Sequence, residues 1–119
     1  MKIGAAAAAS GCHIETIRYY ERIGLLPHPA RSVSGYREYL PEEVDRLRFI
    51  TRGRELGFSL EEIRSLLTLS DDPTLSCRDV DQLARHHLAD VRQRLRELRR
   101  IAQELERTIA SCAGGKRGQ

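Results

Sequence analysis

The sequence predicts a mainly α-helical protein in which a winged helix-turn-helix head precedes a long dimerisation helix. Two short helical patterns, separated by a serine–glycine turn, predict the helix-turn-helix. A β-prone stretch around a later glycine predicts a small hairpin, the wing. Towards the C-terminus, apolar residues alternate at spacings of three and four, which is the pattern of a coiled-coil helix.

The head begins with two short predicted helices. Residues 3–9 are rich in alanine, which has the highest helix propensity, and Ser10 and Gly11 end this stretch. From 14 to 23 the apolar residues recur with a helical period. Gly24 then ends the second helix, as glycine commonly does at a helix C-terminus. A tight turn between two short helices is the arrangement of a helix-turn-helix.

A hairpin and a third helix are expected next. Residues 31–39 contain two β-prone pieces that flank Ser34 and Gly35, so we expect the hairpin to turn at these two residues. A small hairpin that follows a helix-turn-helix forms a wing. Pro41 suits the first turn of the next helix, which continues to Leu56.

Two serines mark the expected starts of the last two helices. Ser59 is followed three residues later by Glu62, a capping-box pattern, and the helix that it opens continues to Leu69. Ser76, with Asp79 three residues later, caps the last and longest helix.

The longest helix carries an unbroken heptad repeat of apolar residues. Its positions are Leu88, Val91, Leu95, Leu98, Ala102, Leu105, Ile109 and Cys112, with Val80 and Ala84 upstream. The outward positions are mostly Arg, Glu and Gln, so the helix cannot bury this stripe within its own chain. It requires a partner helix, most simply that of a second copy. The chain therefore divides into a head at 1–70, a dimerisation helix at 76–112 and a tail at 113–119.

Charge and motifs exclude several functions. The net charge of +3 is modest, so any basic surface must be local. One basic stretch lies between residues 16 and 37, where Glu21 opposes four arginines: Arg18, Arg22, Arg31 and Arg37. No nucleophile–base pair, phosphate-binding loop or HExxH pattern occurs, so we do not expect an enzyme.

The cysteines and the hydropathy pattern indicate the compartment. Three cysteines, an odd number, argue against a secreted disulfide framework. No apolar run approaches the roughly 20 residues that cross a membrane, and the N-terminus lacks the pattern of a signal peptide. We therefore expect a cytoplasmic protein with no membrane partner, whose cysteines are buried apolar residues, metal ligands or reactive thiols.

Three blocks of sequence carry a family resemblance. They are IETIRYYERIGLLP at 14–27, SGYREY at 34–39 and LRFITRGRELGFSLEEIRSLL at 47–67. In order and spacing they resemble the MerR family of transcription regulators, and the similarity extends from Lys2 to about Cys112. The likeness is greatest to the metal-responsive branch, which includes mercury, lead, cadmium and zinc sensors. In that branch one cysteine opens the dimerisation helix and another closes it, as Cys77 and Cys112 do here.

The resemblance implies an architecture and a mode of action. Two chains would form a homodimer through an antiparallel two-helix coiled coil. Such regulators bind a promoter whose spacer is too long for RNA polymerase, and the metal-loaded dimer kinks and untwists it. We therefore expect promoter DNA and RNA polymerase as partners, and an activator that serves heavy-metal resistance.

The resemblance also implies the DNA contacts. They fall on the second helix and on the wing, at Thr16, Arg18, Tyr19, Arg31, Tyr36 and Arg37. General chemistry agrees, because a short helix with polar tips enters a major groove, and arginines beside a hairpin reach phosphates. The alternative is that these arginines form a solvated helix face and that Tyr36 packs against the hairpin.

The metal ligands implied by the resemblance are Cys77 and Cys112. They are 35 residues apart, which corresponds to roughly 50 Å of helix, so they cannot share an ion within one chain. An antiparallel dimer would bring Cys77 of each subunit beside Cys112 of the other, giving two equivalent sites. Thiolates without histidine or carboxylate select a soft ion, here Hg(II), Pb(II), Cd(II) or Zn(II). Copper(I) sensors of the family usually have Ser at the Cys77 position.

Metal-sensing members carry one more cysteine a few residues beyond the Cys112 position. Here the third ligand is absent or lies beyond Gln119, so residues 113–119 are a flexible tail or a truncated metal-binding loop. Alternatively, Cys77 is a residue of the helix cap and Cys112 fills the apolar stripe. Cys12, in the helix-turn-helix turn, is expected to be a small buried residue.

Two other functions remain open at this point. One keeps DNA binding and makes the cysteines sensors of oxidants or electrophiles. The other is a helical interaction module that binds no DNA.

Overall fold

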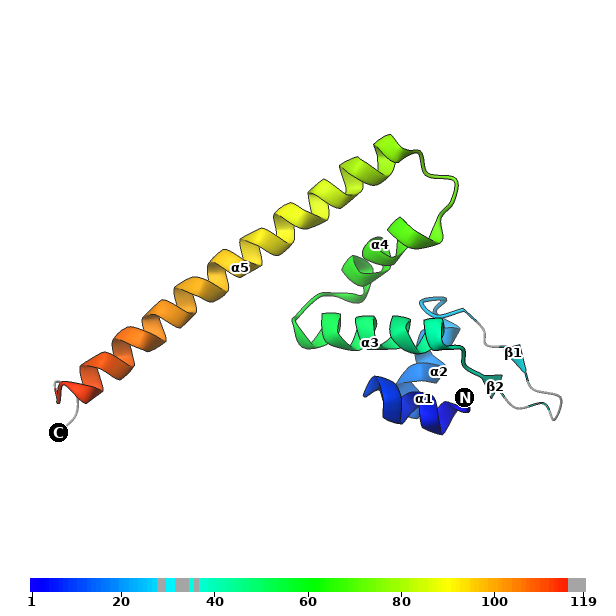
Figure 1. The fold of residues 1–119 in the computed structure, drawn as a ribbon, viewed down its shortest axis with the longest axis horizontal. Coiled ribbons are helices and arrows are strands. Elements are labelled where there is room, and N and C mark those ends of the chain that lie inside the picture. Colours follow the sequence, from blue (N-terminus) through cyan, green and yellow to red (C-terminus); the bar gives the residue numbers. More distant parts are fainter. Residues whose placement is uncertain (28–29, 32–34, 36, 116–119) are drawn as a thin grey trace. The chain divides into compact units, whose positions relative to one another are not determined.

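The computed structural model of the chain describes residues 1–27, 30–31, 35 and 37–115. Two compact units result, Met1–Thr68 and Leu69–Gln119. The first unit contains the helices α1 (Ile3–Ser10), α2 (Ile14–Arg22) and α3 (Pro41–Glu55), with the strands β1 (Ala30–Arg31) and β2 (Arg37–Glu38). Helix α4 (Leu60–Asp71) follows, and helix α5 (Cys77–Ala113) makes up most of the second unit (Figure 1). The mainly helical fold predicted from the sequence is confirmed.

The helix-turn-helix is closed by two glycines in the left-handed region. Gly11 has φ 73° and its N–H donates to the Ala7 carbonyl, which ends α1. Gly24 has φ 75° just beyond the end of α2. A side chain at either position would be strained, because L-residues rarely adopt this region. The two predicted helix stops are therefore confirmed.

The wing is a short antiparallel pair. Ala30 lies opposite Glu38 and Arg31 lies opposite Arg37, as a hairpin between these strands requires. The predicted turn at Ser34 and Gly35 falls largely outside the described residues, and so does Tyr36.

The core of the head joins its helices and the segments between them. Its largest fully buried side chains are Ile17, Leu25, Leu26, Tyr39, Leu47, Ile50 and Ile63. Helix α3 approaches α4 closely at Gly53, where a Cβ would stand only 3.1 Å from a side-chain carbon of Ile63. Glycine at this position therefore brings the backbone of α3 directly onto the α4 side chain.

Three arginines bind the ends of the helix-turn-helix. The Arg48 Nε donates to the Ala9 carbonyl at the end of α1, at 2.9 Å. The Arg46 Nε donates to the Leu25 carbonyl at 2.9 Å, and an Arg64 nitrogen donates to the Ile23 carbonyl at 2.8 Å. Carbonyls at a helix end lack partners within the helix, so these guanidinium groups fix both helices to α3 and α4.

The serine caps form as predicted. At the start of α4, the Glu62 N–H donates to Ser59 Oγ and the Ser59 N–H donates to a Glu62 carboxylate oxygen, both at 3.0 Å. At the start of α5, the Asp79 N–H donates to Ser76 Oγ at 3.1 Å.

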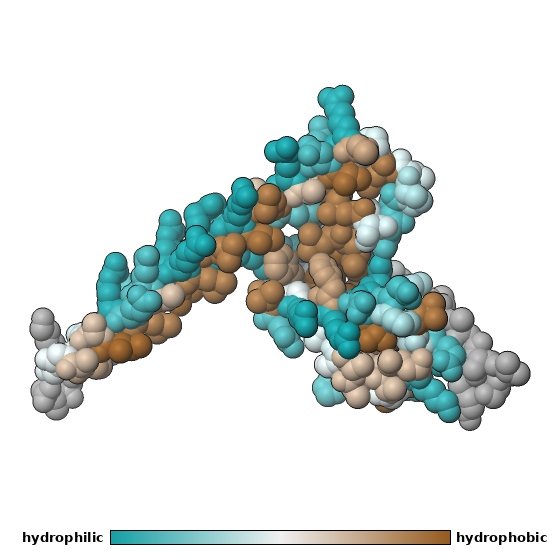
Figure 2. Space-filling model, viewed as in Figure 1, coloured by the Kyte–Doolittle hydropathy of each residue, from teal (hydrophilic) through white to brown (hydrophobic). Residues whose placement is uncertain are grey.

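Helix α5 has 37 residues and no buried side chain. Hydrophobic residues gather along one side of it and hydrophilic residues along the other (Figure 2). Leu88, Leu98 and Ile109 of this stripe are 45, 57 and 69% exposed in the single chain. Among the described residues, none of the helices is both long and apolar enough to cross a membrane.

Candidate nucleic-acid interface and metal ligands

Helix α2 has one buried face and one polar face. Ile17 and Tyr20 face the core, while Arg18 and Tyr19 are exposed and Thr16 is half-buried. The three predicted DNA contacts of this helix therefore lie on or beside its accessible face. A short helix that presents such side chains can enter a major groove.

Two side-chain interactions lie on the exposed face of α2. Arg18 forms an ion pair with Glu15, one turn earlier, with the closest atoms 3.0 Å apart. The Arg22 guanidinium lies over the Tyr19 ring, 5.6 Å from its centroid. Such exposed contacts are weak and can be exchanged for DNA. The sequence predicts Arg22 only as part of the basic stretch, although its position three residues after Tyr19 makes the two neighbours on the helix.

The wing contributes one described side chain to the candidate interface. Arg31 and Arg37 stand opposite each other in the strand pair, and Arg37 is half-exposed. An Arg37 nitrogen lies 3.1 Å from a carboxylate oxygen of Glu21, which offsets its charge.

Glu21 is the unexpected member of this region. It is only 3% exposed, and it accepts a hydrogen bond from the Tyr39 hydroxyl in addition to its ion pair with Arg37. Burial, followed by the hydrogen bond to Glu21, raises the pKa of Tyr39 to about 12. In the sequence Glu21 is one acidic residue among arginines, and no local period reveals that it meets Arg37 and Tyr39.

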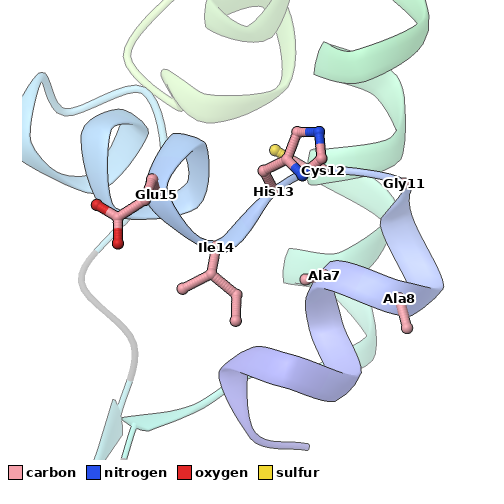
Figure 3. Close-up of a pocket in the computed structure, with 7 residues that line it drawn as sticks. All are labelled: Ala7, Ala8, Gly11, Cys12, His13, Ile14 and Glu15. Atoms are coloured by element: carbon pink, nitrogen blue, oxygen red, sulfur yellow. The ribbon is translucent and has the colours of Figure 1, made fainter.

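A hollow between α1 and α2 contains Cys12. It is lined by Ala7, Ala8, Gly11, Cys12, His13, Ile14 and Glu15 (Figure 3). Cys12 is 7% exposed, and burial raises the pKa of its thiol more than hydrogen bonding with Thr51 lowers it. The thiol is therefore held in its neutral form, which agrees with the prediction of a small buried residue.

The other two cysteines lie at opposite ends of α5. Cys77 is the first residue of the helix, Cys112 is the second to last, and both thiols are free and exposed. The helix between them is roughly 50 Å long, so a single chain does not bring them together. Within the part of the chain that the structure describes, no group of three or more His, Cys, Asp or Glu residues could hold a metal ion.

Models of two known protein families match this chain. A family model described as "MerR HTH family regulatory protein" matches residues 1–69, and one described as "MerR, DNA binding" matches residues 44–108. The transcriptional regulator HmrR of Rhizobium leguminosarum is 43% identical over 117 residues, covering 98% of this chain and 90% of that protein.

The descriptions of two further similar proteins name a metal. The mercuric resistance operon regulatory protein of Bacillus cereus is 42% identical over 115 residues, which cover 97% of this chain and 87% of that protein. The crystal structure of the transcription regulator PbrR691 from Ralstonia metallidurans, in complex with lead(II), is 42% identical with a TM-score of 0.59. That match covers 93% of this chain and 87% of PbrR691.

Proposed function

The chain belongs to the MerR family of helix-turn-helix regulatory proteins, and from this premise we propose that it works as a homodimer responding to a soft divalent metal ion. As a member of that family it is a DNA-binding transcription regulator and not an enzyme. The observation that carries the proposal is the pair of exposed thiols at the two ends of an unpaired amphipathic helix.

DNA is bound by α2 and the wing in this proposal. Arg18 and Tyr19 read the major groove, with Thr16 beside them, because these side chains are accessible on the polar face of α2. In the wing, Arg31, Tyr36 and Arg37 contact the phosphates, which position the protein without reading sequence. The exposed ion pair and ring contact on α2 support this assignment, since both can be replaced by DNA contacts at little cost.

The dimer forms through α5. Its apolar stripe is exposed in the single chain, and a long exposed stripe at heptad spacing is buried most simply against a second copy. Ile101 is 57% exposed and lies next to the stripe, so it widens the surface available for pairing. In an antiparallel pair, the first residue of each helix comes to lie near the last residues of the other.

The metal ion would be held between subunits, by Cys77 of one chain and the partner's Cys112. Two features of these cysteines support a metal site between subunits. Both thiols are exposed and free, and their spacing along α5 excludes a site within one chain. When bound, a soft ion supplies thiolate bonds that link the two subunits. The names of the Bacillus cereus and Ralstonia relatives support mercury and lead as candidates, alongside cadmium and zinc.

The polypeptide connects Cys77, the proposed metal-binding residue, to the DNA-binding head. Cys77 follows α4 after a short segment, and Arg64 of α4 donates to the Ile23 carbonyl at the end of α2. A change in the position of α4 is therefore transmitted to the end of the recognition helix. In this way the metal-bound dimer would distort its promoter for RNA polymerase, in the cytoplasm where thiols stay reduced.

The test uses a promoter duplex selected by the wild-type protein from random sequences. DNA bending is followed by energy transfer between the duplex ends, with Hg(II), Pb(II), Cd(II) or Zn(II) added in turn. We expect at least one ion to change the bend, and Cys77→Ser to bind the duplex but lose the response. A response to peroxide and to no metal would contradict metal sensing, and failure to select any duplex would contradict the DNA-binding assignment.

A further inference from the structure

The buried carboxylate of Glu21 connects the recognition helix to the wing. Glu21 lies one turn after Ile17, so it shares the inward face of α2. One of its carboxylate oxygens accepts from the Tyr39 hydroxyl and the other lies 3.1 Å from an Arg37 nitrogen. Both partners belong to the wing: Arg37 begins β2, and Tyr39 directly follows that strand.

A buried carboxylate lowers the stability of the fold unless both of its oxygens have hydrogen-bond or ion-pair partners. Removing a charge from water is unfavourable, and losing one partner of a buried pair leaves the other uncompensated. Glu21 meets this requirement because each of its oxygens has its own donor. The raised pKa of Tyr39 keeps the phenol protonated, so it remains a donor throughout the physiological range. The geometry of the wing is therefore coupled to that of α2 through one side chain.

We propose that Glu21 is a positioning residue for sequence-specific DNA binding, which holds Arg37 and Tyr39 so that the wing and α2 meet one DNA site in register. The inference rests on the proposed function, in which both elements contact DNA. Glu21 itself is 3% exposed and does not touch DNA.

The position of Arg37 gives this role a distinctive energetic signature. Its side chain is 33% exposed, so the guanidinium faces both Glu21 and solvent. Arginine has five N–H donors, which leaves donors for a phosphate after the carboxylate has been satisfied. The negative charge of Glu21 nevertheless weakens the attraction of this region for any DNA. Glu21 therefore reduces non-specific binding and increases specific binding.

The test compares two duplexes, the selected promoter duplex and a scrambled duplex of equal length and composition. Glu21→Gln preserves the size of the side chain and removes its charge. We expect at least a tenfold loss of affinity for the promoter duplex, no loss for the scrambled duplex, and a salt slope steeper by about one unit. General destabilisation would weaken binding to both duplexes, so a loss that is confined to the promoter duplex identifies a positioning role.

Two further variants complete the test. Tyr39→Phe removes one donor without changing charge, so promoter affinity should fall at least threefold with an unchanged salt slope. Glu42→Gln is the matched control, because it removes an equal charge at the exposed start of α3 and should leave the ratio of the two affinities unchanged. In the double variant of Glu21 and Tyr39, the two losses should not add, because both residues act through one contact.

The outcomes separate this inference from the proposed function. If the wild-type protein does not prefer the promoter duplex, the DNA-binding assignment fails. If the wild-type prefers it and Glu21→Gln keeps the same ratio of affinities, the positioning role alone is overturned. Should Glu21→Gln not fold, Tyr39→Phe decides, and an unchanged ratio in that variant overturns the role.

Discussion

The head and helix α5 differ in how many of their apolar side chains are buried within one chain. The head buries a cluster of side chains drawn from α1 to α4, whereas α5 buries none of its own. The head therefore has a core within one chain, whereas the stripe on α5 is exposed and would be buried only in the proposed dimer. We therefore expect mutations to separate the proposed assembly through α5 from DNA recognition by the head.

The largest effect is expected where two copies of one residue are lost together. Leu98 lies near the middle of the stripe, so Leu98→Ala should destabilise the dimer by about 2–5 kcal/mol for each of two leucines. Sedimentation equilibrium should show a larger dissociation constant, so the variant dimer dissociates at higher protein concentrations than the wild-type dimer. Arg100→Ala, on the outward side of α5, is the control. An unchanged dissociation constant for Leu98→Ala would contradict pairing through the stripe.

Ile17→Ala is the substitution in the head that corresponds to Leu98→Ala in α5. Ile17 is fully buried, so its truncation should cost about 2–5 kcal/mol per chain. Because this core is complete within one chain, the dissociation constant measured in sedimentation should stay near that of the wild type. Thermal denaturation should instead show a lower stability of the folded chain. A dimer that dissociates as readily as that of Leu98→Ala would break the separation between the two regions.

A smaller effect is expected from pH. The pKa of Tyr39 is raised from 10.0 to about 12, so its stabilising contribution is complete below pH 10. Between pH 10 and 12 the unfolded chain releases this proton first, and about 2–3 kcal/mol of stability is lost as pH rises. Urea denaturation of wild type and Tyr39→Phe should differ most at neutral pH and converge towards pH 12. Parallel curves over this range would contradict the prediction.

The smallest expected effect is on DNA binding. Arg18 is exposed and its pair with Glu15 is worth little, so Arg18→Ala should not affect folding. Its loss should weaken promoter binding by about 1–3 kcal/mol for a base contact, or flatten the salt slope by about one unit for a phosphate contact. Mobility shifts at several salt concentrations distinguish the two. Unchanged affinity and slope would remove Arg18 from the interface.

Local signals in the sequence predicted most of the fold. The stop at Gly24 and the cap at Ser59 depend on residues within one turn of each other, so a linear pattern reveals them. The apolar stripe of α5 was predicted for the same reason, whereas its pairing with a second chain stays a prediction. The contacts of Glu21 and Arg64 were not foreseen, because their partners lie far along the chain and meet only through tertiary packing.

In the candidate DNA interface, too, local patterns were predictable from the sequence and long-range contacts were not. Arg18 and Tyr19 were identified from a motif within one helix, and the structure leaves both accessible. Arg37 was expected simply to reach a phosphate. Its position against a buried carboxylate could not be anticipated, because Glu21 looked like one more surface charge on a polar helix.

The most direct test of the account mixes two single variants, Cys77→Ser and Cys112→Ser, carrying different affinity tags. In a purified heterodimer, an antiparallel α5 pair has two intact cysteines at one end and two serines at the other. Titration with Pb(II), followed by thiolate–metal absorption, should find no site in either parent and one restored site in the heterodimer, half the wild-type number. A parallel pair would instead leave a two-cysteine site in both parents. Verified heterodimers that bind no Pb(II), although the wild-type dimer binds it, would contradict the shared site.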